Sequence, residues 1–108
     1  MYVYFLKAAA PLVGPKGAGR AGSLIKIGSA ADPMKRMAKL QTGSPVQLRM
    51  IGSVRCRDAA HARCVERLAH NIFAKQRRRG EWFRLSARHE AQLVSLIARC
   101  GAGDAENL

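Results

Sequence analysis

The sequence predicts an α+β domain in which helices cover a central antiparallel sheet. Two apolar, strand-like segments at 2–7 and 23–28 flank a glycine- and proline-rich stretch at 8–22, which favours a wide hairpin because nothing helical lies between them. Strand-like and helical segments then alternate along the chain, which is the pattern of a sheet covered by helices. The 108 residues provide for one domain and not for two.

Four segments are predicted to be extended. The first, 2–7 (YVYFLK), is rich in aromatic and β-branched residues, and the second, 23–28 (SLIKIG), is mostly apolar. The third, 47–57, alternates loosely and contains Gly52, where we expect a bulge. The fourth is a short piece at 81–85 (EWFRL).

Three helices are predicted from capping residues and helical periodicity. Asp32 followed by proline begins the first helix, and the turn residues at 43–45 end it. Asp58 begins the longest helix, which we expect to end at Gly80, and Ser86 caps the last helix. The apolar stripes expected to be buried are Val65, Leu68, Ile72 and Phe73 in the second helix and Leu93, Leu96, Ile97 and Cys100 in the third.

The domain is expected to span 1–100, with 101–108 as a frayed tail. Three cysteines without a CxxC pair argue against a disulfide framework and favour the reducing cytoplasm. The apolar start at 2–6 lacks a preceding basic region, so we expect no secretory signal. No apolar run approaches the roughly 18 residues that span a bilayer, so no membrane partner is expected.

The charge of the chain points to a polyanionic partner. The formal net charge is +12, and between residues 33 and 80 twelve basic residues stand against two acidic ones. A solvated surface explains any single cation, but an excess of one sign costs self-repulsion and is expected where phosphates are neutralised. The residues expected to contact nucleic acid are Lys35, Lys39, Arg63, Arg67, Arg77, Arg78 and Arg79.

The small number of acidic residues limits the chemistry. Asp32 and Asp58 are committed to helix caps, which leaves Glu66, Glu81 and Glu90 outside the C-terminal tail. A two-metal hydrolytic site draws on several clustered carboxylates, so we do not expect one. A single divalent ion held by one glutamate stays open.

Glu66 is the best candidate for that glutamate. It lies in the middle of the predicted second helix, within the basic region, and His70 follows one turn later on the same face. By spacing alone, an ordinary ion pair with Arg63 or Arg67 explains Glu66 better than a metal does.

Four segments taken together resemble the GIY-YIG endonuclease superfamily, above all its small phage and bacterial branch, in which the second signature reads KIG. They are YVYFLK, IKIG, DPMKRMAKLQTGSP and VERLAHNIFAKQRRRGEWFRL, and the resemblance covers about residues 2–86. It implies a three-stranded antiparallel sheet flanked by helices. It also implies hydrolysis of DNA phosphodiester bonds with a single Mg²⁺ or Mn²⁺.

The resemblance assigns roles by position. Tyr4 matches the last tyrosine of the first signature, and Gly28 matches the glycine of the second. Arg36 matches the catalytic arginine, and Glu66 matches the carboxylate that holds the metal. Two further positions typical of the branch are matched by His70 and Trp82.

The sequence departs from the family at two points. The first signature lacks its glycine, and Lys26 replaces the tyrosine of the second. Because the family's tyrosines position or deprotonate the attacking water, Tyr4 and Lys26 are both candidates for the base. Lys26 lies in an apolar strand, near the expected Arg36 and metal cations, and both desolvation and like charge favour a neutral amine. We therefore expect Lys26 to be the stronger candidate.

Three functions follow in order of preference. The first is a metal-dependent DNA endonuclease or the nuclease module of a DNA-processing system. The second is a catalytically silent DNA-binding module with the same basic surface, and the third, resting on charge alone, is an RNA or membrane-surface binder. The length leaves no room for a separate recognition domain, so specificity is expected from DNA shape, a homodimer or another DNA-processing protein.

Overall fold

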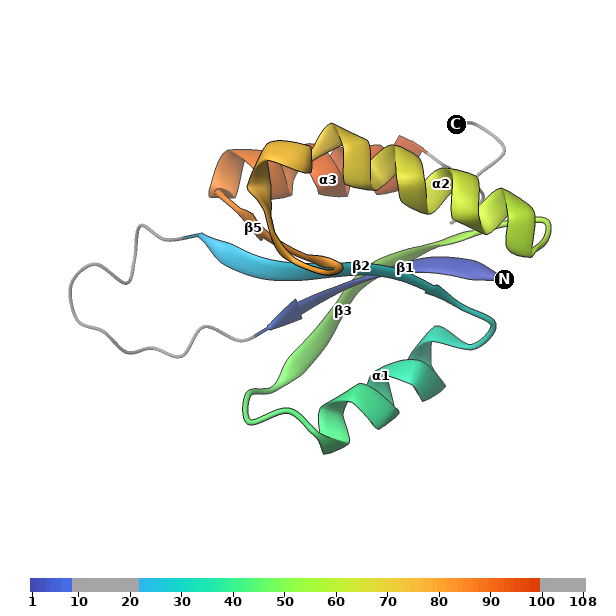
Figure 1. The fold of residues 1–108 in the computed structure, drawn as a ribbon, viewed down its shortest axis with the longest axis horizontal. Helices are drawn as coiled ribbons and strands as arrows, with labels where there is room; N and C mark the ends of the chain where they lie inside the picture. The colour runs from blue at the N-terminus through green and yellow to red at the C-terminus, as the bar shows by residue number, and fades with distance from the viewer. Residues whose placement is uncertain (9–21, 100–108) are drawn as a thin grey trace.

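The computed structural model describes residues 1–8 and 22–99 and confirms the α+β class (Figure 1). Residues 9–21 of the expected loop, Cys100 and the expected tail at 101–108 lie outside the described residues. The elements, in chain order, are β1 (Tyr2–Ala8), β2 (Ser23–Ala30), α1 (Pro33–Thr42), β3 (Leu48–Arg55), α2 (Ala59–Ile72), the 3₁₀ turn η2 (Ala74–Gln76), β4 (Arg77–Arg79), β5 (Trp82–Leu85) and α3 (Ala87–Arg99).

One antiparallel sheet organises the domain, with strand order β3-β1-β2-β5-β4. The three strands implied by the resemblance, β1, β2 and β3, are its longer members, and β5 and β4 extend it on one side. The expected bulge is confirmed, because Phe5 pairs with Gly52 whereas Leu6 pairs with Met50, which leaves Ile51 as the extra residue.

β5 corresponds to the predicted short extended piece at 81–85, whereas β4 arises because the second helix is shorter than its sequence predicts. α2 ends at Ile72, and the run expected to be helical up to Gly80 instead forms η2 and β4. Gly80 has a φ of +56° and lies in the turn between β4 and β5. A residue without a Cβ adopts that backbone conformation without steric cost. Gly80 is therefore a hairpin glycine and not a helix stop.

The predicted helix starts are confirmed by their capping bonds. The Asp32 carboxylate accepts a hydrogen bond from the Lys35 amide at 3.1 Å, and the Asp58 carboxylate accepts one from the His61 amide at 2.8 Å. The Ser86 hydroxyl accepts one from a backbone amide of the first turn of α3 at 3.2 Å. Each cap satisfies a donor that a helix leaves unpaired at its N-terminus.

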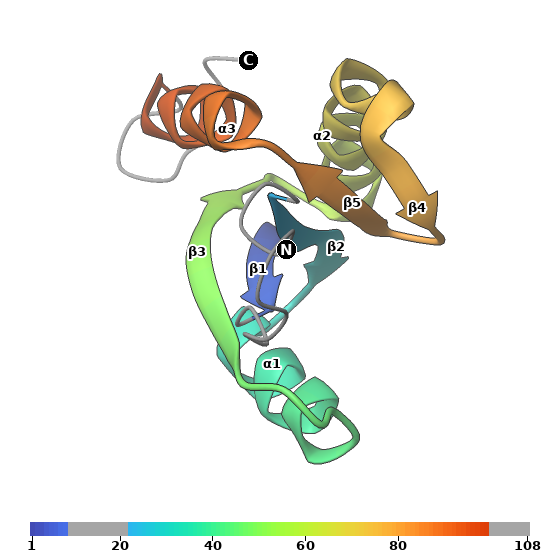
Figure 2. The ribbon, with the colours of Figure 1, turned by 90° about the vertical axis from the view of Figure 1, so that its left-hand side faces the viewer.

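The helices lie on both faces of the sheet, α2 and α3 on one face and α1 on the other (Figure 2). The larger core cluster lies beneath α2 and α3, where Val65, Phe73 and Leu93 are buried as predicted. A smaller cluster built around Tyr4 and Leu6 packs against α1. No helix among the described residues is both long enough and apolar enough to cross a bilayer.

The predicted stripe of α2 is wrong at two positions. Leu68 and Ile72 are 42% and 46% exposed. The buried face is built from Ala62, Val65 and Ala69, which recur at helical spacing. Alanine is small and only weakly marks a buried helix face. The sequence pattern therefore assigns the buried face of α2 to the larger leucine and isoleucine.

Candidate functional site

The candidate site lies where strand pairing on β2 stops. β5 pairs with β2 only from Ser23 to Lys26, so the rest of β2 continues without a neighbouring strand on that side. There the Ile27 amide donates to the Glu81 carbonyl oxygen at 3.0 Å. The Ile27 carbonyl oxygen lies 3.1 Å from Nε2 of His70. Side chains from both faces of the sheet can therefore meet at this open edge.

Tyr4 reaches the edge across Gly28, its partner in the β1–β2 ladder. Tyr4 is only 2% exposed. A Cβ atom on Gly28 would lie 2.7 Å from the Tyr4 hydroxyl oxygen and 2.9 Å from Oε1 of Glu81. Such contacts are too close for a side chain, so the glycine makes room for the hydroxyl and the carboxylate to approach one point. This is a physical reason for the glycine that the resemblance matched.

Lys26 forms an ion pair with the same carboxylate. Its Nζ lies 3.0 Å from Oε1 of Glu81 and 5.7 Å from the ring centroid of Trp82, and its side chain is 13% exposed. The sequence prediction placed cations beside Lys26, but the structure places an acid there. That difference weakens the case for Lys26 as a base, because an ammonium held in an ion pair has no lone pair with which to accept a proton.

Glu66 approaches the edge from α2. Its Oε2 lies 3.7 Å from Nε2 of His70. Burial raises the pKa of Glu66 above its ordinary value of 4.5, and the hydrogen bond and charge of the Glu81 carboxyl raise it further. A hydrogen bond from Ser29 and the charge of His70 act in the opposite direction. Glu66 and Glu81 are therefore neighbouring carboxylates at one site.

The alternative explanation of Glu66 as an ion-pair partner of Arg63 or Arg67 is wrong. Both arginines are exposed on α2, and His70 is the ion-pair partner of Glu66 within the described part of the chain. The observed contacts therefore exclude the ion pair with an arginine that the spacing along the helix favours.

His70 joins α2 to the edge of β2. A carbonyl oxygen can only accept a hydrogen bond, so the contact with Ile27 requires the proton on Nε2. The imidazole ring also lies 5.0 Å from the ring of Phe83, tilted by 52°. These contacts fix the ring beside the Glu66 carboxylate.

Among the described residues, no contact joins the Arg36 side chain to the side chains at the edge of β2. Arg36 is exposed in the first turn of α1, which begins three residues after β2 ends. Its place in the fold is thus next to the end of β2 that carries Gly28 and Ser29. Lys35 and Lys39 are exposed on the same helix.

The arginine run forms the edge strand β4. Arg77, Arg78 and Arg79 are all exposed, and Arg77 Nε donates to the Gly80 carbonyl oxygen at 2.7 Å. Glu81 lies in the turn that follows β4. The three arginines are therefore only a few residues from Glu81 along the chain. This arrangement places cations beside the site, where a phosphate backbone could be held.

Glu81 is the site residue that sequence reasoning missed. Glu81 is one of the three glutamates outside the tail that have no helix-capping role, and its segment GEWF contributes to the resemblance. Nothing in the spacing of the sequence links it to Glu66. The link depends on the hairpin between β4 and β5, which the sequence pattern does not reveal.

The side chains present fit a divalent cation such as Mg²⁺ or Mn²⁺. Mg²⁺ prefers oxygen ligands and is commonly held by one or two carboxylates while it keeps several waters. Glu66 and Glu81 supply two carboxylates, and the described residues contain no group of three or more histidine, cysteine, aspartate or glutamate side chains that could hold a metal ion. Burial is the main reason that the pKa of Glu66 is raised, and the neighbouring Glu81 carboxyl raises it further, so a cation bound between the two carboxylates would offset repulsion between them.

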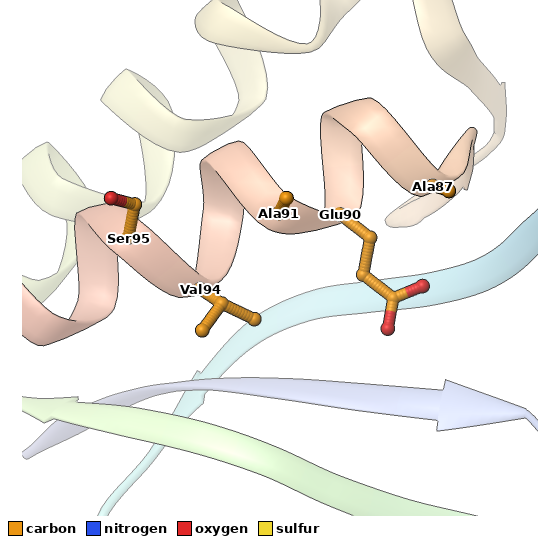
Figure 3. Close-up of a pocket in the computed structure, with 5 residues that line it drawn as sticks. All are labelled: Ala87, Glu90, Ala91, Val94 and Ser95. Carbon is orange, nitrogen blue, oxygen red and sulfur yellow. The ribbon is translucent and has the colours of Figure 1, made fainter.

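A hollow lies elsewhere, on one side of α3 (Figure 3). It has a volume of about 570 Å³ and is lined by Ala87, Glu90, Ala91, Val94 and Ser95. Among the described residues that line the hollow, Glu90 is the one acid, and it is paired with Lys7 at 2.9 Å. These described residues provide no acid–base pair within the hollow, so we place the candidate site at the β2 edge.

Comparison with known proteins gives one match. The family model described as the T5orf172 domain matches residues 1–100. This is a phage-associated domain related to GIY-YIG and HNH-like nucleases. No curated protein and no solved structure matches the chain.

Proposed function

The chain belongs to the T5orf172 domain family, and from this premise we propose that it is a metal-dependent DNA endonuclease of the GIY-YIG type. It would hydrolyse phosphodiester bonds with one Mg²⁺ or Mn²⁺. The observation that carries the proposal is the convergence of Tyr4, Glu66 and Glu81, from β1, α2 and the β4–β5 turn, on the open edge of β2. The high positive charge supports DNA as the substrate.

Each role in phosphodiester hydrolysis has a candidate group. The bound cation would supply a Lewis acid for the phosphate oxygens. Glu66 would hold the cation, and His70, fixed by the Ile27 carbonyl, would keep the Glu66 carboxylate in position. Arg36, at the start of α1, would stabilise the negative charge that develops on the phosphate.

We assign the attacking water to Tyr4 and not to Lys26. The Tyr4 hydroxyl oxygen and Oε1 of Glu81 both approach one point above Gly28, so the hydroxyl lies next to the proposed cation and its water. Lys26, in contrast, is committed to Glu81 at 3.0 Å. Tyr4 would position the water and take part in its deprotonation, whereas Lys26 would act as a cation within the site.

The exposed cations would bind the DNA backbone. Phosphate contacts fix the register of a protein on DNA without reading its sequence. Sequence or structure specificity would then come from DNA shape or from a partner, such as a second copy of the chain in the cytoplasm. The proposed phosphate contacts are Lys35, Lys39, Arg63, Arg67, Arg77, Arg78 and Arg79.

The test is incubation of the purified chain with supercoiled plasmid in Mg²⁺ or Mn²⁺, beside a matched sample in EDTA. We expect conversion of supercoiled to nicked plasmid that needs the metal. A mobility shift without nicking in any divalent metal would overturn the endonuclease and support a silent DNA-binding module. Neither shift nor nicking would overturn both functions.

A further inference from the structure

We propose that Glu81 is a second ligand of the divalent cation and that Lys26 is its counter-ion, which the cation displaces on binding. The inference rests on the proposed function, because that function places a divalent cation at Glu66. It adds a ligand and a competitor that the family resemblance does not assign. It also gives a role to the lysine that departs from the family pattern.

The first support is the position of the Glu81 carboxyl group. It lies between the Lys26 ammonium, 3.0 Å from Oε1, and the carboxyl group of Glu66. The backbone of Glu81 is anchored, because its carbonyl oxygen accepts a hydrogen bond from the Ile27 amide at 3.0 Å. The preceding Gly80 supplies the tight turn, so the carboxyl is presented to the edge by fixed backbone.

The second support is the balance of charge at the edge. Two neighbouring carboxylates repel each other, and one ammonium offsets only one of them. An ammonium group only donates hydrogen bonds, and it repels a metal cation. Lys26 and a metal ion therefore compete for the same carboxylate. A divalent ion offsets both carboxylates and is therefore expected to take the place of Lys26 beside Glu81. The Trp82 ring, 5.7 Å from Nζ, offers the released ammonium a cation–π contact.

The third support is the hydroxyl of Tyr4. Tyr4 is 2% exposed, and its oxygen and Oε1 of Glu81 both lie within 3 Å of one point above Gly28. A hydrated cation held by Glu66 and Glu81 would bring a water molecule to this hydroxyl.

The experiment is a titration of the metal-free full chain with Mn²⁺, in which electron paramagnetic resonance reports the free ion. We expect Glu66→Gln and Glu81→Gln each to weaken Mn²⁺ binding by about 10-fold or more. Lys26→Met removes the competing ammonium and should tighten binding several-fold. The matched controls, Lys7→Met and Glu90→Gln, break an ion pair of similar length outside the site and should leave the affinity unchanged.

The outcomes separate the inference from the function on which it rests. Absence of Mn²⁺ binding by the unmodified chain would overturn the metal-dependent function itself. Weaker binding in Glu66→Gln with normal binding in Glu81→Gln would overturn the second ligand and leave the function standing. Unchanged or weaker binding in Lys26→Met would overturn the role of Lys26 as a competitor. Circular dichroism of each variant checks that it is folded, and the Lys26→Met arm tests the inference without altering either carboxylate.

Discussion

Two lysine–glutamate ion pairs of nearly equal length have very different surroundings. Lys7 and Glu90 lie 2.9 Å apart and join β1 to α3, beside the hollow drawn in Figure 3. Lys26 and Glu81 lie 3.0 Å apart and join β2 to the β4–β5 turn. Within the part of the chain that the structure describes, the second pair alone lies beside another carboxylate, an indole ring and the Tyr4 hydroxyl. The neighbours of an ion pair, and not its length or a nearby hollow, therefore distinguish the candidate site.

The sheet explains the difference. β1 pairs with β2 on one side and with β3 on the other along its whole length, so its backbone offers no open edge. β2 loses its β5 neighbour after Lys26, which exposes the Ile27 backbone to Glu81 and His70. The candidate site lies where the β2–β5 pairing ends, because polar side chains from both faces of the sheet can reach that point.

The largest effect expected outside the metal site is that of Arg36→Ala. If Arg36 stabilises charge in the transition state, its loss should lower kcat on the order of 10³-fold and change DNA affinity little. Single-turnover cleavage and separate binding measurements distinguish the two quantities. Lys35→Ala and Lys39→Ala, on the same helix, serve as controls and should mainly weaken binding. Equal effects of all three substitutions would make Arg36 one more surface cation.

A smaller effect separates Tyr4 from Lys26. Tyr4→Phe removes the hydroxyl that we assign to the attacking water and should lower the cleavage rate about 100-fold, as loss of a general acid–base group does. Lys26→Met should lower the rate less at saturating metal, because the cation replaces its charge beside Glu81. The reverse order, with loss of the basic limb of the pH–rate profile in Lys26→Met, would return the role of base to Lys26.

The arginine strand should affect binding and not chemistry. Neutralising Arg77, Arg78 and Arg79 together should make the plot of log affinity against log salt shallower by about 0.9 for each lost phosphate contact. Because Arg77 is already bonded to the Gly80 carbonyl, we expect Arg78 and Arg79 to account for most of the change. Filter binding on duplex DNA across a salt series measures the slope, and an unchanged slope would assign β4 to solvated surface.

The smallest effect concerns stability and pH in the metal-free chain. The pKa of Glu66 is raised above 4.5, so the folded state holds this proton more tightly than the unfolded state does. That contribution is complete below about pH 4.5 and is lost as the pH rises through the raised pKa. Urea unfolding of the unmodified chain and of Glu66→Gln should therefore show a stability difference that shifts in favour of the variant with rising pH. Parallel pH profiles would contradict the raised pKa of Glu66.

Much of the fold could be predicted because local chemistry determines it. Asp32, Asp58 and Ser86 mark helix starts by bonds within one turn, and the apolar alternation of the first strands needs no distant information. The buried face of α2 differs from the prediction because alanines form much of it. The end of α2 differs because the sequences of η2 and β4 have no distinctive pattern. The sequence predicts a helix end at Gly80 because a glycine is typical both of a helix C-cap and of a hairpin turn.

The candidate site could be predicted only in part. The resemblance picked out Tyr4, Glu66 and His70, which the fold brings to one edge, and Gly28, whose missing side chain lets the groups meet. It did not pick out the role of Glu81. That proposed role depends on where β5 begins, because its pairing with β2 extends only as far as Trp82 and Lys26. Strand pairing of this kind depends on residues far apart in the sequence and not on the segment itself.

The most direct test of the β2 edge as the active site compares two glutamates in one plasmid-nicking assay. Glu66→Gln and Glu90→Gln make the same chemical change, the first at the carboxylate pair and the second at the isolated ion pair beside the hollow. We predict that nicking in Mg²⁺ or Mn²⁺ is lost in Glu66→Gln, with DNA affinity retained, and is normal in Glu90→Gln. Undiminished nicking by Glu66→Gln, or its loss in Glu90→Gln alone, would contradict the placement of the active site.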